Sequence, residues 1–366
     1  MDEQLLTEKL IGYDTSHPEG IKQCAGFVKG WLDAREIHTR QIDCRGLPVT
    51  LAEVGAADAQ TTLLLHGHID VVPGREEQFE ARLDGDRLYG RGAYDMKGAL
   101  AAMLLAVADL RESGVKVRLG VVPDEESEED FERGGDLLVA EGFLGDFVIT
   151  GEPTDMHVGV AAKGVVAMRV RVDGRAAHGA TPWLGENAIL RAIDVFRAIQ
   201  SLPFASRSSE LFDRPSINLG RILGGDALNK VPDTCYIDVD VRFLPEQDPD
   251  AILAEVEGIP GATIVSTFRR PPAMVDPDSP FVRALCIATE AHAEGEVTSV
   301  GRDGASDAVS FLRAGVPAVE FGPVGGGHHG PEEWVSVSSL AAYRGALVEF
   351  VDGLQTRLRA VGGEAA

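Results

Sequence analysis

The sequence contains few cysteines, and no two of them form a C-x-x-C pair. Four are scattered along the 366 residues: Cys24, Cys44, Cys235 and Cys286. Isolated cysteines of this kind are typical of free, buried thiols in a reducing compartment, not of a disulfide framework or a thiolate metal site. We therefore expect no cysteine among the functional ligands.

Basic residues are also few in relation to acidic ones. The chain has 34 Lys and Arg against 58 Asp and Glu, and its formal net charge is −24. Binding to nucleic acid requires a basic face, so this charge balance excludes nucleic acid as the expected partner. The simplest interpretation of the charge is a solvated acidic surface, and adaptation to high salt is the alternative.

A long apolar run is absent as well. The sequence has no apolar stretch of about 18 residues, and its start, MDEQLLTEKL, lacks the basic segment and apolar core of a secretory signal. We therefore expect a cytoplasmic protein that does not associate with a membrane. With 44% hydrophobic and 25% charged residues over 366 positions, the composition is typical of a globular protein with two domains.

Strand-like and helix-like segments alternate in the N-terminal part of the chain. The strand-like segments are VTLAEV (49–54), TLLLHGHI (62–69), VRLGVVP (117–123) and GDFVITG (145–151), and residues 95–110 have the composition of a helix. Alternation of this kind predicts an α/β fold, with a mixed, mostly parallel sheet and helices on both of its faces.

The pattern changes at about Gly164. Segments then follow in the order strand, helix, strand, strand, helix, strand: residues 165–174, 186–202, 216–223, 235–243, 248–258 and 262–268. This is the order of a ferredoxin-like α+β sandwich, in which one face of the sheet is exposed. The α/β alternation resumes after Pro272. We therefore predict a domain formed by residues 1–163 and 273–366, into which a smaller domain of residues 164–272 is inserted.

Imidazole and carboxylate side chains occur where several of the predicted strands end. They are His68 and Asp70 in an H-x-D pair, Asp95 at the start of a predicted helix, the run Asp124, Glu125 and Glu126, then Glu152, and finally the pair His328 and His329. The carboxyl ends of parallel strands lie at one edge of a sheet, so we expect these side chains to converge there. Imidazole and carboxylate donors without thiolate suit a catalytic site for divalent metal, and their number allows two ions that share a carboxylate.

Each of these residues also has a structural interpretation. His68 fits a hydrogen-bonded loop histidine, Asp95 fits a helix N-cap, and the run of three carboxylates fits acid–base chemistry as well as metal binding. GRGAYDMKG does not match the dinucleotide-binding pattern G-x-G-x-x-G. The metal site is favoured because several donors follow predicted strands. Within it, Asp70 lies two positions after His68, where its carboxylate can orient a metal-bound imidazole.

A set of motifs, in this order and spacing, resembles that of the co-catalytic di-zinc amidohydrolases. The motifs are HGHIDVVP, YGRGAYDMKG, DEE, GEPT, GRAAHGATPWLGENAI and HHGPEEW, and they extend from about residue 60 to 340. This family includes acetylornithine deacetylase, succinyl-diaminopimelate desuccinylase, glutamate carboxypeptidase and the aminoacylases. The resemblance implies a metallohydrolase of C–N amide bonds with two divalent ions per chain. Zn²⁺ is preferred, and Co²⁺ or Mn²⁺ also suits a carboxylate-rich site.

The resemblance also assigns roles to residues of the motifs. Asp95 would bridge the two ions, and His68 would bind one of them with Glu152. The full set of implied metal ligands is His68, Asp95, Glu126, Glu152 and His329. Glu125 would be the general base, and Asp70 would orient His68.

The last motif distinguishes between two adjacent histidines. His329 is preferred over His328 because only His329 has Glu333 four positions later, as the family's motif requires. Glu332 replaces the Asp or Asn that is usual in the family. His66 lies outside the first motif and is expected to be structural.

The inserted domain contributes three further candidates. By resemblance, His178 would hydrogen-bond the developing oxyanion, Asn229 would contact the same region, and Arg242 would bind a substrate carboxylate through its planar guanidinium. A surface histidine and a solvent-exposed arginine are the alternative interpretations of His178 and Arg242. His178 lies in a different domain from every metal ligand, so a lid of the same chain or of a partner must bring it to the metals. The resemblance implies a homodimer through this lid domain, with His178 acting in trans.

The implied function is hydrolysis of N-acyl-L-amino acids, of the deacetylase or desuccinylase type. An exopeptidase, either a carboxypeptidase or a dipeptidase, shares every motif and is the alternative. A non-catalytic binding protein would have lost the base or a ligand, yet Glu125 and all the ligand positions are present, and a metal-free scaffold would bind no stoichiometric metal. Gly304, Ala305, Ser306 and Asp307 stand where desuccinylases usually have Gly-Thr-Ser-Asp, which weakens the case for succinyl-diaminopimelate as the substrate.

Overall fold

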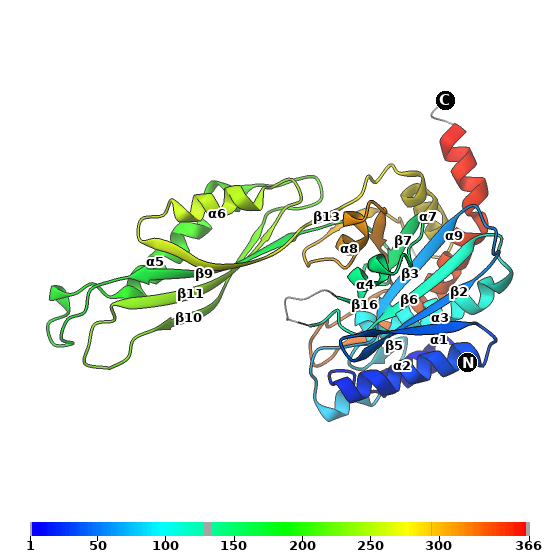
Figure 1. Cartoon of the computed structure of the whole chain (residues 1–366), viewed down its shortest axis with the longest axis horizontal. Helices are drawn as coiled ribbons and strands as arrows, with labels where there is room; N and C mark the ends of the chain where they lie inside the picture. Colours follow the sequence, from blue (N-terminus) through cyan, green and yellow to red (C-terminus); the bar gives the residue numbers. More distant parts are fainter. Residues whose placement is uncertain (1, 128–132, 294, 364–366) are drawn as a thin grey trace. The chain divides into compact units, whose positions relative to one another are not determined.

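The computed structural model describes residues 2–127, 133–293 and 295–363. The chain forms two compact units (Figure 1). Unit 1 consists of Met1–Val160, Val275–Val300 and Asp307–Ala366, and unit 2 consists of Ala161–Met274 and Gly301–Ser306. The cysteines are free thiols. Within the described ranges, no helix is both long enough and apolar enough to cross a membrane.

The main sheet is parallel at its centre and antiparallel towards its ends. Its strands follow the order β1 (Thr39–Cys44), β2 (Leu47–Val54), β6 (Lys116–Val122), β3 (Thr62–His68), β7 (Phe147–Thr150), β15 (Ala318–Glu320), β8 (Val158–Ala162) and β13 (Ala273–Met274), with β14 (Ser299–Arg302) paired to β8. β3 is parallel to both β6 and β7, and β15 is parallel to β7. The antiparallel pairs include β1 with β2, β2 with β6, and β15 with β8. The predicted mixed sheet is confirmed, with its parallel strands in the middle.

Helices lie on both faces of this sheet, as the side chains of β3 demonstrate. His66 packs edge-on against Phe311 of α8 (Ala308–Arg313), with ring centroids 5.2 Å apart. Its neighbour Gly67 faces Met96, just before α3 (Gly98–Asp109), so closely that a Cβ atom would meet the Met96 side chain at 2.7 Å. Successive residues of a strand point to opposite faces, so α8 and α3 lie on opposite faces of the sheet.

The remaining helices of unit 1 extend these two layers. They are α1 (Glu3–Ile11), α2 (Pro18–Asp33), α4 (Gly134–Ala140), α7 (Pro280–Glu290) and α9 (Val337–Gly363). α4 packs against α8, whereas α1 and α9 pack against α3, and α7 packs against α9. The sequence of α3, GALAAMLLAVAD, is rich in strong helix formers and apolar all round, as expected of a helix buried between a sheet and other helices.

A small antiparallel sheet in unit 1 joins two segments that are far apart in the sequence. Its strands follow the order β16 (Gly325–Gly326), β17 (Trp334–Ser336), β5 (Arg87–Tyr89) and β4 (Arg82–Asp84). Leu88 pairs with Val335, and both are fully buried in one cluster with Ile11, Ala93 and Leu340. This pairing places the segment that begins at Gly90 next to the segment that ends at Glu333, where the Gly90 N–H donates to the Glu333 carbonyl at 3.0 Å.

Unit 2 has the predicted ferredoxin-like order. An antiparallel sheet runs β10 (Ser216–Gly224), β11 (Thr234–Phe243), β9 (Gly164–Asp173) and β12 (Ala262–Arg270), and it packs with α5 (Ala188–Gln200) and α6 (Pro249–Glu257). Strand β10 forms one edge of the sheet and strand β12 forms the other.

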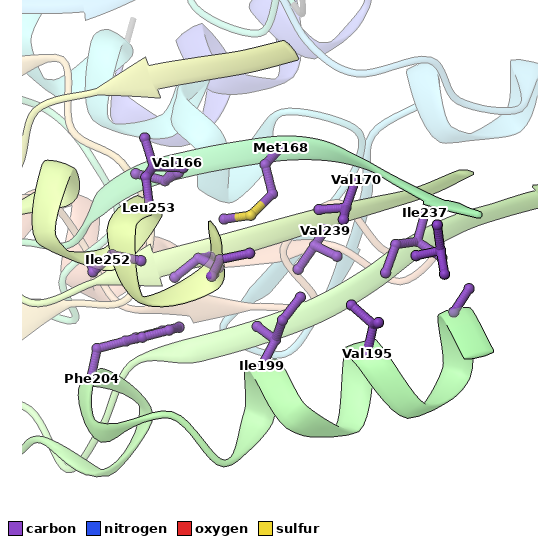
Figure 2. Packing of buried hydrophobic residues seen from close by; sticks show 14 of the residues in the cluster. Val166, Met168, Val170, Val195, Ile199, Phe204, Ile237, Val239, Ile252 and Leu253 are labelled. Carbon is purple, nitrogen blue, oxygen red and sulfur yellow. The ribbon is translucent and has the colours of Figure 1, made fainter. Parts of the chain in front are cut away.

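The strict alternation of β11 separates the core of unit 2 from the open face of its sheet. Ile237 and Val239 are buried, and Figure 2 shows them directed towards α5, which carries Val195 and Ile199. Burying one such side chain stabilises the fold by about 1.5–3 kcal/mol. The intervening Asp238 and Asp240 are only half-buried and lie on the open face. The core of unit 2 is therefore apolar, and its charges are on the outside.

Candidate metal centre

Three neighbouring parallel strands bring predicted donors together at one edge of the main sheet. β3 ends with His68, β6 is followed by Glu125 and Glu126, and β7 is followed by Glu152. Because β6, β3 and β7 are adjacent and parallel, their carboxyl ends lie side by side. The other donors, Asp95 and the His328–His329 pair, come from the segments that the small sheet joins.

Asp95 lies in a turn, not at the start of a helix as its sequence context predicts. The turn spans Ala93–Lys97, and α3 begins only at Gly98 with Lys97 in the N-cap position. The backbone of Asp95 has φ −120° and ψ 97°, which is extended. The N-cap interpretation of Asp95 is therefore wrong. Its buried carboxylate contacts histidines on two sides instead.

His68 contacts two of the predicted ligands. Its Nε2 lies 3.0 Å from Asp95 Oδ1 and 3.6 Å from Glu152 Oε1, and its ring is fully buried. On the other side of the ring, Nδ1 lies 3.0 Å from the backbone carbonyl of Asp70 and 3.5 Å from the Asp70 carboxylate. The carboxylate of Asp70 also accepts from the Glu126 N–H at 2.8 Å. Asp70 therefore orients His68 chiefly through its backbone oxygen and links it to the Glu126 segment.

The second oxygen of Asp95 faces the adjacent histidines. His329 Nε2 lies 3.4 Å from Asp95 Oδ2 and 3.0 Å from Glu126 Oε1. The two oxygens of Asp95 thus serve two groups that can each hold a metal ion: His68, Asp95 and Glu152 on one side, and Asp95, His328 and His329 on the other. This is the arrangement expected of a bridging carboxylate.

His328 approaches Asp95 more closely than its predicted role as a mere neighbour suggests. Its Nε2 lies 2.5 Å from Asp95 Oδ2. His329 has a φ of 58°, a left-handed conformation that is uncommon for a residue with a side chain. The two rings lie with their centroids 4.2 Å apart at 72°. The doubled histidine was visible in the sequence, but only the fold shows that both imidazoles reach the same carboxylate oxygen.

Two imidazoles of this cluster, those of His68 and His329, carry shifted pKa values. Burial disfavours the protonated ring of His68, yet hydrogen bonds to Asp70 and Asp95 raise its pKa well above the usual value. Hydrogen bonds to Asp95 and Glu126 raise the pKa of His329 to about 10. The carboxylates therefore strongly favour positive charge at both imidazole positions.

The buried carboxylates are shifted in opposite directions. Burial favours the neutral form of Asp95, but hydrogen bonds to His328, His329 and His68 hold its pKa well below the usual range. Burial and the neighbouring Asp95 raise the pKa of Glu152 well above its usual value. The nearby His68 opposes this rise without cancelling it, whereas Asp95 has hydrogen bonds to three imidazoles.

Two divalent cations fit these donors. Glu152 Oε1 is buried and makes no hydrogen bond to the residues that the structure describes. Burying a carboxylate oxygen without a hydrogen bond is costly, and a cation beside it would offset that cost. Carboxylate and imidazole donors without thiolate suit Zn²⁺, and also Co²⁺ or Mn²⁺.

Glu125 lies beside this cluster but has a different partner. Its side chain is 21% exposed, and Arg133 Nη1 lies 3.4 Å from its Oε1. Arg133 also donates to the backbone carbonyls of Glu125 and Ser127. Burial, followed by the nearby Asp307 carboxylate, raises the pKa of Glu125 well above its usual value. A carboxyl group with a raised pKa suits proton transfer. The proximity of Arg133 and Asp307 to Glu125 depends on the fold, and the sequence contained no signal for it.

Asp124, the first member of the same acidic run, is used structurally. Its carboxylate accepts from the Gly134 N–H at 2.9 Å, and Cys44 Sγ donates to it at 3.4 Å. Burial and this carboxylate raise the pKa of the Cys44 thiol to about 12. Asp124 therefore ties the loop after β6 to α4 and β1.

The three candidates of the inserted domain all lie in unit 2. His178 is exposed, and its Nδ1 accepts from the Ala180 N–H at 3.1 Å. The backbone carbonyl of Asn229 accepts from the Gly179 N–H at 2.7 Å, so the loops that carry His178 and Asn229 lie side by side. Arg242 lies near the end of β11, where its guanidinium binds the Asp240 carboxylate at 2.9 and 3.0 Å.

A model of peptidase family M20/M25/M40 matches residues 64–353. A succinyl-diaminopimelate desuccinylase from Caulobacter vibrioides (strain NA1000 / CB15N) is 28% identical over 310 residues, which cover 79% of this chain and 80% of the desuccinylase.

Solved structures share the fold at low sequence identity. A tripeptidase from Staphylococcus aureus superimposes with a TM-score of 0.79 at 19% identity, over 98% of this chain and 99% of its own. An M20 family metallo-carboxypeptidase, Sso-CP2 from Sulfolobus solfataricus, gives a TM-score of 0.77 at 20% identity, over 96% of this chain and 99% of its own. At these identities the likeness concerns the fold.

Proposed function

The chain belongs to peptidase family M20/M25/M40 and is a metal-dependent amide hydrolase, and on this premise we propose that it releases amino acids from N-acyl-L-amino acids. The observation that carries the proposal is the shared carboxylate of Asp95, which has one group of donors at each of its oxygens. The acyl-amino acid class is preferred because the desuccinylase is the more similar relative in sequence. Exopeptidase activity is the second candidate, since the solved structures with this fold include a tripeptidase and a carboxypeptidase.

We assign the metal ligands as His68, Asp95 and Glu152 for one ion and Asp95, Glu126 and His329 for the other. The distances between these donors support the assignment, and so does the buried oxygen of Glu152 that makes no hydrogen bond to the described residues. Bound Zn²⁺ would acidify a water and polarise the substrate carbonyl. Asp70 would keep Nδ1 of His68 protonated, so that Nε2 is free to coordinate.

Glu125 would act as the general base. It would take a proton from the attacking water while the water oxygen forms a bond to the carbonyl carbon. It would then deliver this proton to the leaving nitrogen as the C–N bond breaks, so that the products are a carboxylic acid and an amino acid. The raised pKa of Glu125 supports this role, because a carboxylate of higher pKa accepts a proton more readily.

Residues 164–272 would form a lid and dimerisation domain. His178 would donate to the developing oxyanion, Asn229 would contact the same region, and Arg242 would bind the substrate carboxylate after leaving Asp240. The free edge of β10 and the exposed apolar side chains of unit 2 support a homodimer with His178 acting in trans. These exposed side chains include Trp183, Leu184, Leu190, Ile222, Leu223 and Leu228. The free thiols support a cytoplasmic location.

The test combines metal removal with a substrate profile. Protein purified without chelator should contain divalent metal, lose hydrolysis when the metal is removed, and regain it with Zn²⁺, Co²⁺ or Mn²⁺. N-acetyl and N-succinyl amino acids should then be compared with dipeptides and tripeptides by the amino acids released. Turnover of peptides alone would favour the exopeptidase, and full activity of metal-free protein would contradict both candidates.

A further inference from the structure

A buried ion pair links the two segments that carry Asp95 and His329, and none of the roles above accounts for it. Arg91 Nη1 donates to Glu333 Oε2 at 2.7 Å, and the two side chains are 4% and 1% exposed. The other oxygen of Glu333 accepts from the N–H groups of Tyr94 and Asp95, both at 3.1 Å. Glu333 therefore holds the backbone of the bridging ligand directly.

The same pair also holds the segment of His329. Arg91 Nη2 donates to the carbonyl of His329 at 3.2 Å. Gln78, which is 8% exposed, donates through Nε2 to the carbonyls of Gly330 and Pro331 at 3.3 and 3.4 Å. The Gln78 side chain is itself fixed, because its Oε1 accepts from the Arg75 N–H at 2.9 Å.

The two sides of the metal centre differ in what holds their ligands. His68 is the last residue of β3, and Glu152 comes shortly after β7. The backbone of both strands is fixed by parallel pairing in the centre of the sheet. His329 lies in a loop between β16 and β17, which are only two and three residues long. A ligand on such a loop needs contacts from elsewhere to hold it within about 0.5 Å of a coordinating position.

We propose that Arg91, Gln78 and Glu333 are positioning residues that set metal affinity, with Gln78 acting on the His329 side alone. A buried ion pair is seldom more stabilising than an apolar pair of the same size, so stability alone is a poor reason for charge here. The planar fork of arginine binds two acceptors in a fixed geometry, here the Glu333 carboxylate and the His329 carbonyl. Residues that orient metal ligands change metal affinity about 10- to 100-fold when they are replaced. The proposal rests on the metal-dependent function proposed above.

The experiment titrates the metal-free protein with Zn²⁺ by calorimetry and compares three variants with the parent. Gln78→Leu keeps the volume of the side chain but removes the donors to the loop. It should lower the affinity for one of the two ions about 10- to 100-fold and leave the affinity for the other unchanged. Glu333→Gln should lower the affinity for both ions, because Glu333 holds the backbone of Asp95 and both proposed ligand sets include Asp95. Arg344→Gln is the matched control, since it breaks ion pairs with Asp109 and Glu3 in the same unit, and it should change neither affinity.

Unchanged affinities in both Gln78→Leu and Glu333→Gln would overturn the proposal, as would an equal loss in Arg344→Gln. If Glu333→Gln fails to fold, Gln78→Leu still decides, because it removes only neutral hydrogen bonds and leaves the ion pair intact. A parent protein that takes up no Zn²⁺ would instead contradict the proposed function. The two failures are therefore distinguishable without any measurement of activity.

Discussion

The two units of the chain differ in how much charge they bury. Unit 1 has an apolar core but also buries charged groups in and beside the candidate metal centre, among them Asp95, Glu152 and the Arg91–Glu333 pair. Unit 2 has an apolar interior, and Lys163 is the one buried charged side chain among its described residues, paired with Asp303 at 2.7 Å. Burying charge is costly unless it is paired or binds a cation, so clusters of buried charge with shifted pKa values point to function. The buried charges of unit 1 therefore point to a metal site, whereas the candidate residues of unit 2, such as His178, lie at its surface.

The adjacent residues Glu125 and Glu126 offer the sharpest test of the metal chemistry proposed for unit 1. Glu125→Ala should keep its metal but lose turnover about 10²- to 10⁴-fold, because a general base contributes that much. Glu126→Ala should lose metal as well as turnover, since Glu126 lies 3.0 Å from His329 Nε2 within the donor cluster. Metal content by elemental analysis and kcat on an acyl-amino acid check both outcomes. Equal metal contents in the two variants would contradict the division of roles.

The exposed His178 of unit 2 provides the next largest expected effect. His178→Ala should lower the rate about 10²- to 10³-fold, as expected for one donor to an oxyanion. Mixing this variant with Glu125→Ala, under conditions that exchange subunits, should restore activity if His178 acts in trans. The heterodimer then has one intact site and one doubly altered site. A mixture that stays inactive, with exchange shown by labelled subunits, would exclude the trans arrangement.

Arg242 tests whether the open face of unit 2 contributes to binding. Arg242→Ala should lower kcat/KM on acyl-amino acids about 10- to 100-fold, since a charge-assisted hydrogen bond contributes about 1.5–3 kcal/mol. The corresponding amides, which lack the carboxylate, should be affected much less. Asp240→Asn is the matched variant, because it releases Arg242 from its present partner and should not reduce binding. An equal loss on both substrate classes would make Arg242 structural.

The last prediction concerns His66 and affects stability alone, not activity. Burial, with the nearby His68, lowers the pKa of His66 to about 3. In the unfolded chain this histidine is protonated below about pH 6.5, whereas in the folded protein it stays neutral down to about pH 3. The free energy of unfolding therefore falls as the pH is lowered from about 6.5 towards 3. The loss is about 1.4 kcal/mol per pH unit in that window. The free energy of unfolding should be measured against pH for the parent and for His66→Gln, and it should fall less steeply with acid in the variant. Parallel pH profiles of the two proteins would contradict a neutral, buried His66.

Much of the fold was predictable because it depends on short-range patterns. The apolar strand TLLLHGHI, the helical composition of α3 and the alternation of β11 each reflect which faces of one element are buried. The position of Asp95 was predicted less well. Its segment resembles a helix start, but the contacts of its backbone with Glu333 hold it in a turn, and Glu333 lies 238 positions away.

The sequence by itself determined the order of the elements, the ferredoxin-like insertion and the set of imidazoles and carboxylates that follow the strands. These follow from periodicity and from residue chemistry, both of which are local. Only the tertiary structure decided that both His328 and His329 reach Asp95, that Arg133 and Asp307 are the neighbours of Glu125, and that Arg91 pairs with Glu333. Arg91 and Glu333 are 242 positions apart, and whether two such side chains meet depends on how loops close and helices pack. No local sequence pattern predicts that contact, because it forms only when the whole unit folds.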